Sequence, residues 1–478
     1  MSTRLQIANP RTGQPDHEID AMNESELATL AGRMRTAQPE WAARPIAERG
    51  EILERLGAAI QAHGDAIADA LIADTGRAGI SRIEVANIPQ MLSRWASTGP
   101  ELLERHGQYG FQTAHPTITT DLRLVPYPLV GVISPWNFPL ILALIDAIPA
   151  LMAGCAVLIK PSEVTPRFIR PLMAAVDEIA ELHDVLQIVE GDGATGAALV
   201  PLVDYVAFTG SVPTGRKVGE AAARAFIPAS LELGGKDPMI VLASADPAKA
   251  AATALRASVV NTGQACQSIE RIYVAREIAE PFLAELAEQA SAVQLNFPDI
   301  EQGDIGPFIF ARQADIAQAH IDDALAKGAR LLAGGKVETL GGGKYLRPTV
   351  LVDVTPDMAV MAEESFGPIL PVTVFDTVEE AVALANDSVF GLSGAVMAGT
   401  LEEAESVGTR LQVGGVSLND GSLTAIVWET EKSSFGLSGM GPSRMGDSGF
   451  LRFFRRQAII RQNGTPLPLA AYGEGNGK

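Results

Sequence analysis

Short apolar runs alternate with helical stretches through most of this chain, and this alternation limits the possible folds more than any other feature of the sequence. Between Val130 and Leu242 the runs are "VGVIS", "AVLIK", "VLQIVEG", "VDYVAFTG", "SLELGG" and "MIVLA". After Cys266 the pattern resumes with "ERIYVA", "ARLLAGG", "LRPTVLVDV", "LPVTVFD" and "GLSGAVMA". Repeated strand–helix–strand order is typical of a doubly wound parallel sheet. The sequence therefore predicts an α/β fold with two lobes.

The segments before these runs have a different texture. In the first hundred residues, apolar positions recur at helical spacing, and Gly76 is the expected C-cap of one helix. From about Phe111 to Val130, alternating Thr, Ile, Leu and Val are punctuated by prolines, which predicts a hairpin that projects from the body. We expect this arm to contact a partner subunit.

One apolar segment, residues 139–159, approaches the ~20 apolar residues that cross a bilayer. Asp146, Pro149 and Gly154 interrupt it, and "CAVLI" at its end has the character of a buried strand. We therefore expect a core helix, a turn and a central strand ending at Lys160, with Cys155 as a structural side chain. No membrane partner is expected.

Composition narrows the class of protein. A chain of 478 residues suffices for roughly two to four domains. Two cysteines cannot form a disulfide framework and favour a reducing compartment, so the cytoplasm is the expected location. The formal charge of -20 argues against a nucleic-acid partner. The opening "MSTRLQIANPRTGQPDHEID" lacks the layout of a signal peptide, and no metal-ligand cluster stands out.

Two glycine-rich turns after predicted strands are candidates for binding a dinucleotide. Residues 191–196, "GDGATG", match GxGxxG, but the acidic residue expected about 20 positions later is missing. In "FTGSVPTG" a strand ends at Phe208, Gly210 and Ser211 form the turn, and a helix begins near Pro213, so free N–H groups could meet a pyrophosphate. A tight connection that uses glycine for positive φ explains either turn equally well.

Lys160 and Glu163 in "IKPSEVTP" come just past the carboxyl end of a predicted strand, where open α/β sheets bind ligands. This lysine and carboxylate could hold the two hydroxyls of a ribose. A solvated ion pair is the alternative, and spacing alone favours it.

Cys266 in "NTGQACQSIER" has polar neighbours, whereas a structural cysteine normally lies among Val, Leu and Ile. A helix start at this position would lower the pKa of the thiol and populate the thiolate, so a nucleophile and a small buried side chain are equally supported. A Cys–His pairing has no positive support, because the histidines lie in no distinctive motif. They are residues 17, 63, 106, 115, 183 and 320.

Two further polar side chains occupy constrained positions. Glu232 interrupts the apolar run "SLELGG", where desolvation would shift its basicity toward that of a general base. Asn137 lies in "SPWNFP" between two prolines, so its amide is rigidly placed and could donate to a developing oxyanion. An Asx-type turn is the alternative for Asn137.

Six motifs together resemble the NAD(P)-dependent aldehyde dehydrogenase superfamily in order and spacing. They run from Asn137 to Pro368 and read "PWNFP", "KPSEVTP", "FTGSVPTG", "LELGGKDP", "NTGQAC" and "EESFGP". The later stretch "GVSLND…SSFGLSGMG" is similar to the class 3 and aryl-aldehyde branches. Gln267 and the turn "GSVPTG" depart from the residues most common in the family, without removing a catalytic group.

The resemblance implies a mechanism that needs no metal. Cys266 would attack the aldehyde carbonyl, and Asn137 with the Cys266 N–H would stabilise the tetrahedral thiohemiacetal. Hydride transfer to NAD would leave a thioester, which water activated by Glu232 would hydrolyse. Because the Glu163 carboxylate would repel a 2′-phosphate, NAD is favoured over NADP. The candidate cofactor-binding residues are Ile133, Trp136, Lys160, Glu163, Gly193, Phe208, Gly210, Ser211, Leu233, Glu364 and Phe366.

The resemblance also implies a domain plan and an assembly. Residues 1–108 and 127–235 would form a Rossmann-like cofactor domain, residues 236–435 a catalytic α/β domain, and residues 109–126 with 450–472 a bridging element. A homodimer or homotetramer follows from that plan. The expected substrate is an aromatic or medium-chain apolar aldehyde, because the side chains expected along the substrate tunnel are Trp136, Phe138, Gln267 and Trp428.

Two other functions remain open at this point. One is a cysteine acyltransferase or hydrolase without a redox step, which would yield no NADH from NAD and aldehydes. The other is a catalytically silent member of the family that acts as a binding protein, in which the Cys266 thiol would be inert toward iodoacetamide.

Overall fold

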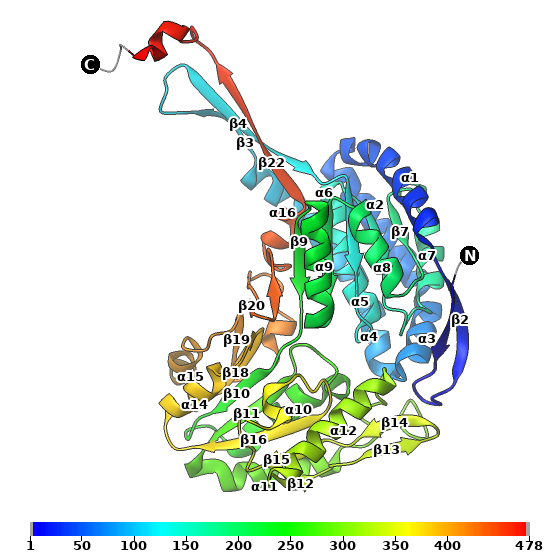
Figure 1. Ribbon diagram of the computed structural model, residues 1–478, viewed down its shortest axis with the longest axis vertical. Coiled ribbons are helices and arrows are strands. Elements are labelled where there is room, and N and C mark those ends of the chain that lie inside the picture. The colour runs from blue at the N-terminus through cyan, green and yellow to red at the C-terminus, as the bar shows by residue number, and fades with distance from the viewer. Residues whose placement is uncertain (1–2, 475–478) are drawn as a thin grey trace.

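The computed structural model describes residues 3–474 and contains two large sheets, one in each half of the molecule (Figure 1). The first has six strands in the order β21-β9-β8-β5-β6-β7. The second has seven, in the order β12-β15-β16-β11-β10-β18-β19. Most neighbouring strands are parallel. The prediction of an α/β fold with two lobes is confirmed.

The first sheet consists of the apolar runs between residues 129 and 232. Its parallel strands are β5 (Leu129–Ile133), β6 (Ala156–Lys160), β7 (Leu186–Ile188), β8 (Tyr205–Thr209) and β9 (Ala229–Glu232). Every residue of β5, β6 and β8 is buried. Helices cover both faces, which explains why these strands read as continuous apolar runs. A short strand from near the C-terminus, β21 (Gly439–Met440), pairs antiparallel with β9.

Helices surround this sheet, and most of the N-terminal ones were expected from the periodicity. Gly76 has φ 67° and ends α3, as predicted for a glycine C-cap. The helices of this half are α1 (Glu24–Ala43), α2 (Ile46–Ala62), α3 (Gly64–Thr75), α4 (Ala78–His106), α5 (Pro139–Leu144), α6 (Ala147–Ala153), α7 (Ile169–Asp177), α8 (Gly193–Leu199), α9 (Val212–Ala225) and α16 (Ser448–Leu451).

The apolar segment at residues 139–159 lies in the core of this half. It forms two short helices, α5 and α6, where we expected one, and then a turn at Gly154 with φ 102° before β6. The break falls at Asp146, a fully buried carboxylate that is bound by Arg444 and Arg452. Cys155 is buried, and burial raises the pKa of its thiol, so the structural assignment is confirmed. No helix within residues 3–474 has the length and apolar content needed to span a bilayer.

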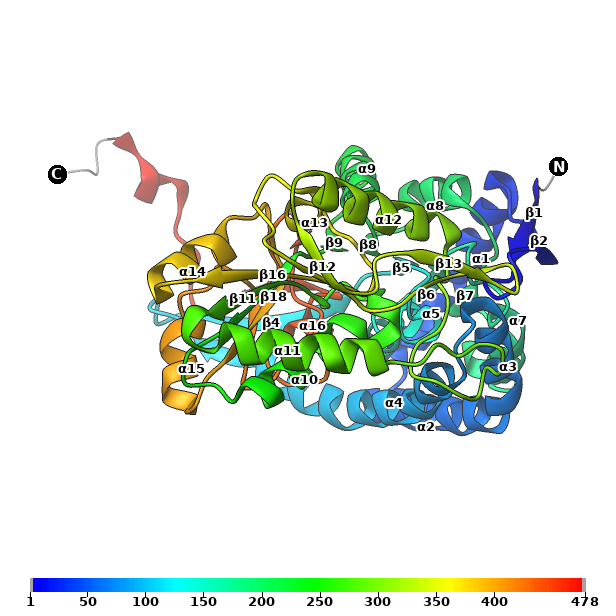
Figure 2. The same cartoon turned by 90° about the horizontal axis from the view of Figure 1, so that it is seen from below.

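The second sheet separates two apolar layers (Figure 2). Helices α10 (Pro247–Val259) and α11 (Arg276–Ala292) pack on one face, and α12 (Ala311–Ala326), α14 (Val378–Asn386) and α15 (Leu401–Gly408) pack on the other. The strands are β10 (Asp237–Val241), β11 (Ile269–Ala275), β12 (Arg330–Ala333), β15 (Thr349–Val352), β16 (Ile369–Phe375), β18 (Ser393–Met397) and β19 (Gly415–Leu418). Only β12 pairs antiparallel within this sheet.

A three-stranded antiparallel sheet projects from the body, at the upper left of Figure 1. It contains β3 (Gln108–Gln112), β4 (Ile118–Pro126) and β22 (Phe454–Gln462). The predicted hairpin arm is therefore present, and β22 adds a third strand whose register with β4 runs from Phe454 opposite Pro126 to Gln462 opposite Ile118. The arm carries the exposed side chains of Tyr109, Phe111 and Ile460.

Several small strand pairs were not foreseen. The chain opens with a hairpin of β1 (Thr3–Ala8) and β2 (Pro15–Ala21), in a region where we expected helices. These strands are mostly exposed and polar, so they lack an apolar run. The remaining elements are β13 (Val337–Leu340), β14 (Gly343–Leu346), β17 (Phe390–Gly391), β20 (Phe435–Gly436) and α13 (Ala359–Ala362).

Candidate active site

A cleft of about 1030 Å³ brings together Asn137, Glu232 and Cys266. Asn137 lies in the loop between β5 and α5, and Glu232 ends β9, so both come from the first sheet. Cys266 lies in the loop that leads into β11 of the second sheet. The cleft is therefore built where the two lobes meet, and it contains all three residues that were singled out for covalent chemistry.

The loop before Cys266 is a tight turn that glycine makes possible. Asn261, Thr262 and Gly263 all have positive φ, of 62°, 58° and 69°. A Cβ at Gly263 would lie 2.3 Å from the Gly367 carbonyl carbon, so a larger residue would displace the backbone there. Gln264 fixes the turn, because its Oε1 accepts a hydrogen bond of 2.9 Å from the Ile309 N–H.

The electrostatic setting of Cys266 differs from the one we expected. The thiol does not stand at a helix start; it lies in a turn between the short helix η3 (Val260–Gly263) and β11. Burial raises the pKa of the Cys266 thiol to about 11, and the nearby ammonium of Lys432 opposes that rise. The expectation of a pKa lowered by a helix N-terminus is therefore wrong, because no helix dipole points at the sulfur.

Hydrogen bonds from both lobes hold Asn137 in place. Its Nδ2 donates a hydrogen bond of 3.0 Å to the Gln264 carbonyl, two residues before Cys266. Its own carbonyl accepts hydrogen bonds from Asn261 Nδ2 at 3.0 Å and from Arg77 at 3.1 Å. An amide NH₂ has two hydrogens, so one N–H remains to donate into the cleft. The side chain bridges two loops and does not close an Asx turn.

Glu232 stands at the end of β9 with 21% of its side chain exposed. Its Oε2 accepts a hydrogen bond of 3.3 Å from the Ser434 hydroxyl, and its Oε1 lies 3.9 Å from Arg444 Nε. The carboxylate therefore has one weak hydrogen bond and one long ion pair, and it keeps acceptor capacity for a water molecule.

Sequence reasoning missed two cations near these groups. Lys432 donates a hydrogen bond of 3.2 Å to Gln267 Oε1, and Arg444 forms a 3.0 Å ion pair with Asp146. Although burial opposes it, the charges of Arg444 and Arg452 hold the pKa of Asp146 below its usual value. Both cations come from the segment after β19, whose sequence carries no motif that indicates which of its side chains enter the cleft.

Lys160 and Glu163, the residues proposed to bind a ribose, lie together at the carboxyl end of β6. Lys160 ends β6, and its Nζ donates to Glu163 Oε2 at 3.2 Å and to the Asp192 carbonyl at 3.0 Å. Gly193 begins α8 directly after Asp192. Gly196 of the same helix lies beside the Lys160 side chain, because a Cβ at Gly196 would be 3.6 Å from Lys160 Cδ. Ile133, at the end of neighbouring β5, lies beside the same helix.

The turn into α9 fits a pyrophosphate. Ser211 is the N-cap of this 14-residue helix but makes no side-chain capping hydrogen bond, so the N–H groups of the first turn lack a capping acceptor. At Gly210 a Cβ would lie 2.6 Å from the Phe208 ring, so the turn closes tightly over Phe208. Leu233 packs against the same helix, where a Cβ at Gly215 would approach its Cδ2 to 2.4 Å.

Glu364 contacts Gly235, and Phe366, two residues further along the chain, contacts Trp136. Glu364 Oε1 accepts a hydrogen bond of 3.1 Å from the Gly235 N–H, and burial raises the pKa of Glu364 to about 8. Phe366, at φ 49°, packs edge-on against Trp136 with ring centroids 5.4 Å apart. Ile133, Lys160 and Phe208 lie at the carboxyl ends of β5, β6 and β8, where open α/β sheets bind ligands, whereas Glu364 and Phe366 lie in the loop between α13 and β16.

The walls of the cleft are mainly apolar and aromatic. Phe138, Gln267 and Trp428 line it as expected, but Trp136 does not, because its ring packs against Phe310 and Phe366. Other apolar lining residues are Met91, Trp95, Ile141, Leu142, Ile145, Ile426 and Met445.

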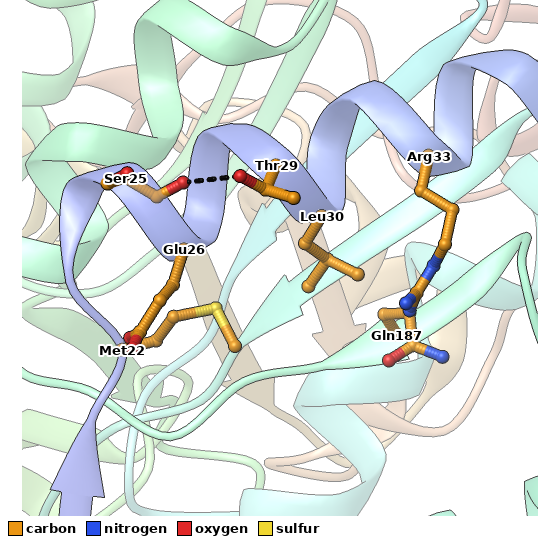
Figure 3. Close-up of a pocket in the computed structure, with 7 residues that line it drawn as sticks. All are labelled: Met22, Ser25, Glu26, Thr29, Leu30, Arg33 and Gln187. Atoms are coloured by element: carbon orange, nitrogen blue, oxygen red, sulfur yellow. Dashed lines mark hydrogen bonds between the residues drawn. The ribbon is translucent and has the colours of Figure 1, made fainter.

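A second depression, of about 390 Å³, lies away from this site (Figure 3). It is formed by one face of α1 and by Gln187 of β7, and it shares no residue with the Cys266 cleft. Leu30 and Met22 form its apolar floor, with Glu26 and Arg33 beside them. Neither a cysteine nor a histidine is among the described residues that line the depression, so it has no counterpart of the Cys266 site.

Comparison with known proteins gives one consistent result. The family model described as "Aldehyde dehydrogenase family" matches residues 1–459. A Mycolicibacterium smegmatis protein provisionally named succinate-semialdehyde dehydrogenase (NADP+) is 36% identical over 94% of this chain and 87% of its own length. The 4,4'-diapolycopene aldehyde oxidase of a Methylomonas species is 37% identical over 96% of this chain and 84% of its own.

A solved structure agrees with these relatives. The aldehyde dehydrogenase PutA of Anabaena variabilis, also provisionally named, superposes with a TM-score of 0.95 at 49% identity, covering 98% of this chain and 99% of that one. The similarity therefore extends over both lobes and the projecting arm.

Proposed function

The chain belongs to the aldehyde dehydrogenase family, and on that premise we propose that it oxidises an aldehyde to the carboxylic acid through a covalent intermediate on Cys266, with NAD as the coenzyme. The observation that carries this proposal is the meeting of Cys266, Glu232 and Asn137 in one cleft between the lobes. A thiol, a carboxylate and a fixed amide are the groups that acyl chemistry at a carbonyl requires.

The first step forms a carbon–sulfur bond. The Cys266 thiolate attacks the aldehyde carbon, and the carbonyl oxygen becomes an oxyanion. The unpaired N–H of the Asn137 amide and the Cys266 backbone N–H donate to that oxygen. Because the other Asn137 N–H is bonded to Gln264, the donor is already oriented before the substrate arrives.

The second step converts the thiohemiacetal into a thioester. Bound NAD supplies the hydride acceptor. Glu364, Phe366 and Trp136 would orient the nicotinamide end. Glu364 is hydrogen-bonded to the N–H of Gly235, and a Cβ added to Gly235 would touch the Cys266 carbonyl at 2.6 Å. This proximity supports direct transfer of the aldehyde hydrogen.

Glu232 completes the turnover. Its carboxylate takes a proton from water, the resulting hydroxide attacks the thioester carbon, and the carbon–sulfur bond breaks to release the acid and the Cys266 thiolate, after which Glu232 gives its proton to solvent. The single hydrogen bond from Ser434 supports this role, since it orients the carboxylate without using all of its acceptor capacity.

The other end of the coenzyme is assigned to the first sheet. Lys160 and Glu163 hold the adenosine ribose, and the turn at Gly210 and Ser211 holds the pyrophosphate. The remaining members of this set are Ile133, Gly193, Phe208 and Leu233. Glu163 supports NAD over NADP, because its carboxylate would face a 2′-phosphate. The mycobacterial relative is named for NADP+, so the preference of this chain for NAD over NADP has to be measured directly.

We propose an aromatic or medium-chain aldehyde as the substrate. Phe138, Trp95 and Trp428 in the cleft walls favour an apolar body. The names of the relatives point to both apolar and acidic aldehydes, because one is named for diapolycopene aldehyde and another for succinate semialdehyde.

The domain plan and assembly stay proposals. We assign residues 1–108 and 127–235 to cofactor binding, residues 236–435 to the catalytic domain, and residues 109–126 with 450–472 to a bridging element in a homodimer or homotetramer of the cytoplasm. The exposed apolar side chains of the arm and the two free cysteines support this assignment.

Two variants test the reaction. Cys266→Ala should abolish NADH formation from NAD and a panel of benzaldehydes, cinnamaldehydes and alkanals. Glu232→Gln should give one burst of NADH, equivalent to the enzyme present, and then stall as the thioester. Continued turnover of Glu232→Gln at the parental rate would exclude Glu232 as the base.

The same assay addresses the two other functions. A parental enzyme that forms no NADH with any of these aldehydes would favour a non-redox acyltransferase or hydrolase. An unreactive Cys266 toward iodoacetamide would favour a silent binding protein.

A further inference from the structure

Lys432, one of the cations that line the cleft, has no ion-pair partner in the part of the chain that the structure describes. The ammonium of Lys432 donates one hydrogen bond, of 3.2 Å, to Gln267 Oε1. Within residues 3–474, no carboxylate lies within the 4.0 Å of an ion pair with Lys432. A lysine ammonium has three donors, and a half-buried one with a single amide partner is poorly compensated for the water it has lost. This position is therefore prepared for an anion.

The Lys432 side chain is held in place along its length. A Cβ at Gly415 would lie 3.1 Å from Lys432 Cδ, so the aliphatic stem packs over that glycine. The Lys432 backbone N–H points at Ser443 Oγ, 3.4 Å away. Burial lowers the pKa of Lys432, while the charge of Glu232 opposes that fall. A second anion beside the ammonium would oppose the fall in the Lys432 pKa further.

The other cations of the cleft already have partners. Arg444 is ion-paired with Asp146 at 3.0 Å, and Arg256 with Asp420 at 2.8 Å. Arg94 donates to the Trp428 carbonyl at 2.8 Å and lies over the Trp95 ring.

The lining of the cleft carries more cationic side chains than carboxylates. Four cationic side chains line it against Glu232 and Glu429, whereas the chain as a whole has a formal net charge of -20. Because Arg256 and Arg444 are paired with Asp420 and Asp146, the positive charge left for an anionic ligand comes from Lys432 and Arg94.

We propose that Lys432 selects aldehydes that carry a carboxylate, whose oxygens accept hydrogen bonds from the ammonium while the aldehyde carbon lies at Cys266. This inference rests on the proposed function of the cleft. Gln267, which holds the ammonium, directly follows Cys266 in the chain, so both ends of a short or medium semialdehyde are placed by the same loop. The apolar walls contact the carbons between the two ends.

The test compares aldehydes that differ only by a carboxylate. The pairs are butanal with succinate semialdehyde and benzaldehyde with para-formylbenzoate, each assayed for kcat/KM with NAD. The parental enzyme should prefer the acidic member of at least one pair. Lys432→Met, which keeps the length of the side chain without its charge, should reduce kcat/KM for that acidic aldehyde roughly 10- to 100-fold more than it reduces kcat/KM for the neutral member.

Lys432→Arg is the matched control, because it keeps the charge and should retain most of the preference for the acidic aldehyde. The ratio of kcat/KM for the acidic aldehyde to kcat/KM for the neutral one reports recognition of the carboxylate, because a change in the chemical step affects both aldehydes of a pair. If Lys432 supported only the Cys266 thiolate, Lys432→Met would slow both members of a pair equally, and that equal loss would overturn the inference. So would a parental enzyme with no preference for either acidic aldehyde.

A binding measurement keeps the inference independent of turnover. In the Cys266→Ala protein, calorimetry should detect succinate or terephthalate, the diacids of the two pairs. The double variant with Lys432→Met should bind the same acid at least tenfold more weakly. Absence of NADH from every aldehyde would defeat the proposed function alone, whereas equal diacid affinity in both proteins would defeat the inference alone.

Discussion

The Asn137 amide donates a 3.0 Å hydrogen bond to the Gln264 carbonyl and thereby ties the loop after β5 to the loop that carries Cys266. These loops belong to different sheets, so the bond fixes an oxyanion donor from one lobe against the nucleophile of the other. Asn261 Nδ2 reinforces the link, because it donates both to the Asn137 carbonyl and to the Gln264 carbonyl.

Replacing Asn137 should slow the chemistry without dismantling the site. We expect Asn137→Ala to lower kcat by about 100- to 1000-fold, which is the usual effect of losing one oxyanion donor. Steady-state kinetics with a saturating aldehyde provide the measurement. Alkylation of Cys266 by iodoacetamide develops no oxyanion, so its rate should stay near the parental value. A parallel loss of alkylation would show that Asn137 acts by holding the loop.

The carboxylate of Glu163 should determine the choice of coenzyme. Glu163→Gln removes the charge that would face a 2′-phosphate and keeps a group that can accept a hydrogen bond from Lys160. We expect the ratio of kcat/KM for NADP to that for NAD to rise about tenfold, or ~1.4 kcal/mol. Glu190→Gln is the control, because that carboxylate pairs with Arg170 outside the proposed ribose site. An unchanged ratio in Glu163→Gln would remove the basis for NAD preference.

The reactivity of the free enzyme's thiol should depend steeply on pH. Burial raises the pKa of Cys266 to about 11, so the thiolate is a minor species at neutral pH. Its fraction, and with it the rate of alkylation by iodoacetamide, should rise about tenfold per pH unit between about pH 7 and pH 9. Lys432→Met should slow alkylation at each pH, since the ammonium opposes the rise in pKa. A rate that is flat across this range would show that the thiol is already ionised.

The buried carboxyl of Asp237 should make stability depend on pH. Burial raises its pKa from 3.8 to about 7, against hydrogen bonds from Ser393 that lower it. Between those two values the folded state binds more protons than the unfolded state, so this group makes the free energy of unfolding fall as pH rises. Urea unfolding should therefore show Asp237→Asn gaining stability relative to the parent from about pH 5 to pH 8. A constant difference between the two proteins would contradict the prediction.

The primary sequence determined the local elements and the order of the motifs. Strands β5, β6 and β8 are buried on both faces, so each had to be a continuous apolar run and could be recognised from its residues. The turns at Gly154 and Gly210 followed in the same way, because tight connections need glycine. Asn137, Glu232 and Cys266 were found by their unusual neighbours and by the family motifs around them.

Only the tertiary structure decided which distant segments meet. Lys432 reaches Gln267 across 165 positions of the chain, and Arg444 reaches Asp146 across 298. No local pattern encodes such contacts, because they depend on how the segment after β19 folds back over the junction of the two lobes. For the same reason the sequence did not reveal the raised pKa of the Cys266 thiol, because burial and charges from remote segments set that pKa. The opening hairpin was likewise decided by packing, because its exposed polar strands leave no apolar run to read.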